Sequence, residues 1–186
     1  MNASLRAIGE TGLGANDIGE RTSNRNWQAR YPEFCARARG TNVNDRTLLA
    51  TDYLNHVNEI IMLLELVPDA PECLEDCRAW QPMNYTEHFQ ASSIADRDLA
   101  IAAYEFSPPE FRGTLDRLTG EMHRVIAGTL ASVEAATAEG DEERVRRVIE
   151  LSVAALKTMV DHASATIHGD AQVMDRAAID GLMDMM

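Results

Sequence analysis

The chain has 186 residues, of which 45% are hydrophobic and 25% charged, and its formal net charge is −13. This length suits one domain whose core needs no disulfide or structural metal. The negative charge argues against nucleic acid and against an anionic membrane as partners, since both would be repelled. Three cysteines, which lack metal-site spacing, indicate reduced thiols and hence a cytoplasmic location. They are Cys35, Cys73 and Cys77.

Residues 1–44 form the first segment, with five glycines, scattered Asn and Arg, and few clustered apolar side chains. Such a segment cannot bury enough apolar surface to order itself, so we expect an irregular arm. Trp27, Tyr31 and Phe34 are the exception and could anchor one short helix. Up to residue 46 there are seven Arg against five acidic residues, so the arm is mildly basic and the body strongly acidic.

Residues 45–67 predict the first long helix, because apolar side chains recur there at spacings of three and four. Pro68 ends it. Short peripheral helices are predicted at about 71–80, 84–92 and 94–106. Pro71 and Pro82 mark the start and the end of the first, and a capping-box pattern starts the third.

Residues 108–138 and 142–168 predict a long αα-hairpin. Ser107, two prolines and a glutamate form a start signal, and Gly140 followed by Asp141 stops one helix and caps the next. Apolar residues of the first helix recur at near-heptad spacing, which favours packing at a shallow angle against another helix. The fold class predicted for residues 45–169 is therefore an all-α helical bundle.

Small residues recur every seven positions on the first hairpin helix, at Gly113, Gly120 and Ala127. Glycine destabilises a helix by about 1 kcal/mol relative to alanine, so we expect another backbone to come close along this stripe. Together with the heptad spacing, the stripe predicts a homodimer formed through the hairpin.

Histidines and a carboxylate suggest a metal site made of His56, Glu59, His123 and His162. Di-metal bundles use Glu-x-x-His pairs that converge on the ions. Here the order of His56 and Glu59 is reversed, and no Glu-x-x-His occurs in the chain. Solvated or capping histidines are the competing interpretation, and no cofactor is expected.

Aromatic residues surround Pro82 at Trp80, Tyr85 and Phe89. They either pack this loop onto the bundle or line a pocket. Glu65 interrupts an apolar run, so its carboxylate should lie at the edge of the buried stripe or pair with an arginine. The chain has no Gly-rich phosphate loop and no nucleotide fingerprint, so nothing supports an enzyme.

Residues 170–186 predict an amphipathic tail helix, in which Ile179, Leu182 and Met183 make one apolar ridge and Asp180 lies at its edge. Residues 174–183 resemble the segment by which the chemotaxis phosphatase CheZ and flagellar switch proteins grip a receiver domain. The resemblance implies that these four residues bind a receiver-type signalling protein.

A second segment, Leu118-Thr119-Gly120-Glu121, is similar to part of the catalytic helix of the same phosphatase family. In that family an Asp and a Gln four residues apart act on the phosphoryl group. Arg117 and Glu121 stand at these positions here, and a carboxylate cannot donate the hydrogen bond of a Gln amide. Catalysis is therefore not carried over.

These patterns favour a non-enzymatic protein-interaction or regulatory module that binds its partner through the tail. The alternative, from another class, is a metal- or small-ligand-binding helical bundle, which could be an enzyme.

Overall fold

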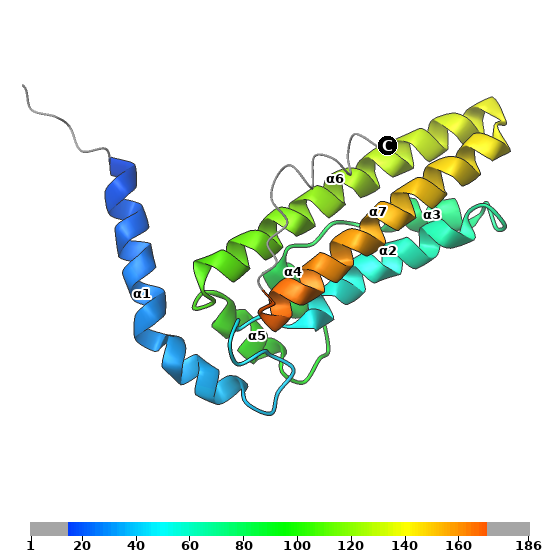
Figure 1. The fold of residues 1–186 in the computed structure, drawn as a ribbon. Helices are drawn as coiled ribbons and strands as arrows, with labels where there is room; N and C mark the ends of the chain where they lie inside the picture. Colours follow the sequence, from blue (N-terminus) through cyan, green and yellow to red (C-terminus); the bar gives the residue numbers. More distant parts are fainter. Residues whose placement is uncertain (1–14, 171–186) are drawn as a thin grey trace, which may run out of the picture.

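The computed structural model describes residues 15–170, with side chains from residue 27 onward. Within this range the chain is all-α with no strand, which confirms the predicted fold class. Long helices run side by side, with α7 packed against both α6 and α2, and the short α4 and α5 pack on each other (Figure 1). The elements are α1 (Ala15–Ala38), the 3-10 helix η1 (Thr51–Tyr53), α2 (Leu54–Leu66), α3 (Cys73–Ala79), α4 (Tyr85–Ala91), α5 (Arg97–Tyr104), α6 (Pro109–Glu139) and α7 (Glu142–His168).

The αα-hairpin of α6 and α7 is confirmed almost to the residue. Pro109 occupies the first helical position of α6, Gly140 ends the helix with φ 73°, and the Asp141 side chain accepts from Arg144 N. The heptad stripe of α6 points into the bundle and is buried against its neighbours. Its buried members are Leu115, Leu118, Met122, Val125, Thr129 and Val133.

The first predicted helix, 45–67, begins later than expected, since η1 starts at residue 51 and α2 at residue 54. Asn44 explains the delay. Its Oδ1 accepts from the backbone N of Arg46 and of Thr47, both at 2.9 Å, which offers the chain a turn instead of a helix. Leu48 then adopts φ 59°, a left-handed conformation that breaks any helix.

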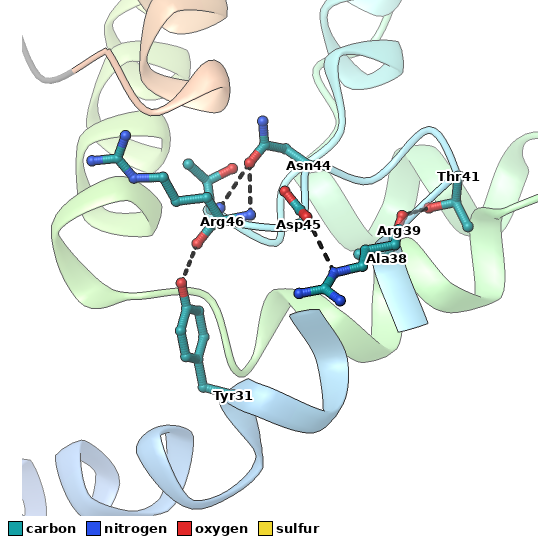
Figure 2. Close-up of polar contacts among 8 residues, drawn as sticks. Tyr31, Ala38, Arg39, Thr41, Asn44, Asp45 and Arg46 are labelled. Carbon is teal, nitrogen blue, oxygen red and sulfur yellow. Dashed lines mark hydrogen bonds and ion pairs between the residues drawn. The ribbon is translucent and has the colours of Figure 1, made fainter. Parts of the chain in front are cut away.

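The irregular arm predicted for residues 1–44 is wrong for residues 15–38, which form helix α1. Its last turns are anchored as the aromatic residues suggested: Phe34 is buried and stacks on Phe106, with ring centroids 4.6 Å apart. Tyr31 donates from its hydroxyl to Arg46 O at 2.6 Å (Figure 2). The rest of α1 extends away from the bundle (Figure 1). A helix that packs against nothing needs no apolar stripe, so the sequence pattern did not predict it.

The small-residue stripe on α6 does not mark a close approach within the described chain. A Cβ atom built at Gly113 or Gly120 would meet nothing within 4 Å among residues 15–170. No backbone within the described chain therefore approaches this stripe, and its contact with a second copy stays a prediction.

The predicted tail helix lies outside the described residues from position 171 onward, and so do Ile179, Asp180, Leu182 and Met183. Of the helices in the described part, none has the length and apolarity that crossing a bilayer requires.

Candidate functional site

The four residues of the predicted metal site are brought together only in part. His56 is buried on α2, and its Nδ1 lies 3.7 Å from Glu59 Oε2. Its Nε2 lies 2.7 Å from the carbonyl oxygen of Gln81, so Nε2 carries a proton that it donates there. His123 on α6 approaches this region, whereas no hydrogen bond, ion pair or ring contact within residues 27–170 joins the half-buried His162 to the other three.

Within the described residues, no group of three or more His, Cys, Asp or Glu side chains is placed to hold a metal ion. The histidines gather around an indole instead. His56 stacks on Trp80 with centroids 4.6 Å apart, and His123 meets the same ring edge-on at 5.9 Å. His88 of α4, which sequence reasoning missed, lies 6.0 Å from His56. We call His56, His88 and His123, with Trp80, the histidine cluster.

Two members of the histidine cluster have a buried ring nitrogen without a partner. Nε2 of His88 and Nε2 of His123 make no hydrogen bond within the described chain. Burial lowers the pKa of both imidazoles, and the nearby His56 lowers it further. Both rings are therefore held neutral, and each is a polar group placed where its hydrogen bonding is incomplete.

The capping of α4 puts His88 in this place. Asn84 Oδ1 accepts from Glu87 N, and the Glu87 carboxylate accepts from Asn84 N, so a full capping box starts the helix. With the start fixed, Tyr85, His88 and Phe89 share the face turned to η1 and α2, where Tyr53 meets Tyr85 at 5.2 Å and His88 at 5.7 Å.

Beside the cluster lies an open pocket of about 510 Å³ between η1, α4, α5 and α6. We call it the tyrosine pocket. Three tyrosines contribute to its wall, and along α6 it follows one face with residues at spacings of three, one and three. Its lining residues are Tyr53, Asn84, Tyr85, Thr86, Tyr104, Asp116, Thr119, Gly120 and His123.

A hydrogen-bonded pair, Tyr104 and Asp116, forms one wall of the tyrosine pocket. The hydroxyl of Tyr104 donates to Asp116 Oδ1. The link between α5 and α6 is only four residues long, which brings Tyr104 against the first turns of α6. Arg112 supports the contact between Tyr104 and Asp116, since its Nη1 donates at 3.1 Å to the carbonyl oxygen of Glu105, the residue after Tyr104.

Loss of hydration raises the pKa of Asp116 above its ordinary value, and this effect outweighs the opposing effects of the Tyr104 hydrogen bond and the Arg112 charge. The tyrosines stay protonated for the same reason: burial raises the pKa of Tyr53 to about 12 and also raises that of Tyr85. Asp116 is the one carboxylate among the residues that line the tyrosine pocket, and no lysine or arginine is among them.

The hydroxyls of the pocket are partly committed to the backbone. Tyr53 donates to Met83 O at 2.9 Å, and Tyr85 accepts from Ala50 N at 2.8 Å. Tyr85 and Tyr104 stack at 4.6 Å, which fixes both rings. The wall is thus rigid before any ligand arrives, which lowers the entropic cost of binding.

Two other hollows on the described surface contain ion pairs. Glu65 and Lys157 line one of them, and Lys157 Nζ donates to Glu65 Oε1 at 2.5 Å. The ion-pair partner of Glu65 is therefore a lysine, whereas an arginine was predicted. Arg146 borders this hollow and a second one, and pairs with Asp69 at 3.3 Å.

Outcomes for the remaining sequence candidates differ. Tyr85 and Phe89 are buried and pack the loop after Pro82 onto the bundle, while Tyr85 also lines the pocket. Arg117 is exposed, and Glu121 pairs with Arg124 on its own helix.

Comparison with known proteins gives no relative: no protein-family model matches the chain, and no curated protein and no solved structure matches it either.

Proposed function

We propose that this helical bundle binds a small molecule in the tyrosine pocket. The observation that carries the proposal is the Asp116 carboxylate on the pocket wall, which is hydrogen-bonded by Tyr104 and has no ion-pair partner within residues 27–170. Carboxylates with a raised pKa inside a concave, largely aromatic site are typical of ligand-binding and active sites.

Polar groups left incomplete nearby support the same proposal. His123 lines the pocket with a neutral imidazole, and it connects through Trp80 to His56. A purely structural core would satisfy or exclude such groups, because each unmade hydrogen bond costs about 1–3 kcal/mol. Ligand-binding sites retain polar groups whose hydrogen bonding is incomplete until the ligand binds.

A fragment screen by amide NMR tests the proposal. We expect bound fragments to shift the amide signals of Tyr104, Asp116 and Gly120. Gly120→Leu should abolish these shifts, since a side chain built there enters open pocket space. Gly128→Leu is the matched control on α6, because Gly128 also has open space but does not line the pocket. Fragments that bind both variants equally would refute the site.

A second proposal concerns protein partners. The heptad stripe that suggested a homodimer is buried inside the chain, so a second copy would contact either the open small-residue stripe of the hairpin or another exposed surface. Met62 and Leu66 lie one turn apart on α2 and are 63% and 51% exposed, which favours an apolar contact there. We expect sedimentation to show a dimer that Leu66→Glu dissociates and Leu151→Glu, on the exposed face of α7, does not. A monomeric wild type would end this proposal.

Binding of a receiver-type partner through Ile179, Asp180, Leu182 and Met183 also remains a proposal. It rests on the sequence resemblance and is tested by a pull-down with residues 171–186 deleted. A cytoplasmic location is proposed in turn on the three cysteines, all of which are free thiols.

A further inference from the structure

Building on the proposed small-molecule function, we propose that the ligand of the tyrosine pocket is an alkyl amine in its ammonium form, held by the Asp116 carboxylate. The ammonium group would donate to Asp116, and the uncharged chain of the ligand would follow α6 past Gly120 toward His123. Charge, hydrogen-bond inventory and shape each support this assignment.

The charge of the lining is the first support. No lysine or arginine is among the residues that line the tyrosine pocket, and Asp116 is its single carboxylate. The nearest cation, Arg112, is engaged elsewhere, since its Nη1 reaches the carbonyl oxygens of Tyr104 and Glu105 at 3.5 and 3.1 Å. Asp116 is exposed at the pocket wall and forms no ion pair within residues 27–170, so its carboxylate is accessible to a ligand cation.

The remaining groups add no positive charge. His123 is held neutral by burial and by His56, and Tyr53 and Tyr85 stay protonated. Asp52 and Glu87 contribute further negative potential near these tyrosines. An anionic ligand would meet this field and a protein of net charge −13, whereas a cation would be attracted by both.

The hydrogen-bond inventory is the second support. Asp116 Oδ1 accepts from Tyr104, and no other hydrogen bond to the carboxylate is seen within the described chain. An ammonium group brings three N–H donors and no acceptor, which suits a carboxylate with free lone pairs. A ligand carboxylate or phosphate would bring only acceptors to the same place.

Shape is the third support. Asp116 and His123 are seven residues apart on α6, so their Cα atoms lie about 10 Å apart along the helix axis. Gly120 lies between them on the same face and has no side chain to fill the space. The pocket therefore extends along the helix, which suits a linear chain with its charge at one end.

Three probes of equal chain length test the inference: hexylamine, hexanoate and hexan-1-ol, each titrated into the full-length protein and followed by amide NMR. We expect hexylamine to shift the signals of Tyr104, Asp116 and Gly120, and the other two probes to leave them unchanged. Asp116→Asn should weaken hexylamine binding about two- to fivefold, the usual loss for an ion pair at an exposed carboxylate. Asp98→Asn is the matched control, because its carboxylate is exposed on α5 and does not line the pocket.

The outcomes separate the ligand class from the function itself. If hexanoate or hexan-1-ol binds as well as hexylamine and Gly120→Leu blocks it, the pocket binds small molecules but the ammonium assignment is wrong. Hexylamine binding that Asp116→Asn does not weaken would show attraction to the acidic surface alone and would overturn the inference. If none of the three probes shifts the amide signals and the fragment screen finds no ligand, both proposals are overturned.

Discussion

The two halves of α6 lie in different surroundings. Toward the hairpin turn the helix packs with aliphatic side chains such as Val133 and Ile149, and charges pair at the surface, as Arg144 does with Glu139 at 2.7 Å. Toward its start the neighbours are tyrosines and histidines, and Asp116 has no ion pair within the described chain. The hairpin half is built for stability, and the other half keeps polar groups that packing alone does not require.

Buried side-chain atoms that lack a hydrogen-bond partner are also unevenly distributed between the two halves. The three side-chain atoms of this kind in the described residues are Nε2 of His88, Nε2 of His123 and Oγ of Ser107. All three belong to α4, the link before α6, or the first half of α6, and none lies near the hairpin turn. Incomplete hydrogen bonding is thus concentrated on the side that carries the tyrosine pocket.

The largest expected effect is a loss of stability when the core between α6 and α7 is truncated. Leu156 of α7 is fully buried, so Leu156→Ala should lower the free energy of unfolding by about 2–5 kcal/mol. Urea unfolding measures it. Because Leu156 does not line the tyrosine pocket, hexylamine affinity of the folded variant should match wild type. A parallel loss of affinity would show that this core and the pocket are coupled.

The next prediction concerns pH. His88 and His123 have pKa values lowered in the folded protein, so between the folded pKa and the unfolded value of about 6.5 the unfolded chain binds more protons. Stability should therefore be fully present above about pH 6.5 and decline as the pH falls below it. In the double variant His88→Gln/His123→Gln this decline should shrink, as thermal unfolding between pH 5 and 8 would show. An unchanged decline would place its origin elsewhere.

A smaller effect is expected from the hydrogen bond on the pocket wall. Tyr104→Phe removes the donor to Asp116 and should cost about 1 kcal/mol of stability. Because that hydrogen bond favours the ionised carboxylate, its loss should raise the pKa of Asp116 further, which NMR titration of the carboxyl carbon reports. Tyr31→Phe is the control: it removes a comparable hydroxyl bond to Arg46 O and should leave the pKa of Asp116 unchanged.

The same contrast between halves explains what the sequence could predict. The hairpin was predictable because Gly140, Asp141 and the heptad stripe are local signals that agree with its packing. The tyrosine pocket was not, because its residues come from η1, α4, α5 and α6 and no spacing joins Tyr53 to Asp116. The available signal was the polar face of α6 around Gly120, which a heptad interpretation assigns to helix packing instead.

The predicted metal site fails to assemble for a related reason. His56 and His123 do approach one another, but Trp80 lies against both rings, and His162 has no contact that joins it to them within residues 27–170. The spacing of the histidines along the sequence does not reveal that the indole of Trp80, at the end of α3, packs against their rings. The fold could therefore be predicted from the sequence, whereas the site required the packing of short helices.

Glycine substitutions on α6 give the smallest expected effect and the sharpest comparison. Gly120→Ala and Gly128→Ala both place a Cβ in open space within the helix, so each should stabilise the protein by up to about 1 kcal/mol. Thermal unfolding should rank them together. Only Gly120 lines the tyrosine pocket, so only Gly120→Ala should also weaken hexylamine binding. Equal affinities in the two variants would mean that the ligand does not pass Gly120, whereas weaker binding in the Gly120 variant alone would show that this half of α6 keeps a glycine for its ligand and not for its fold.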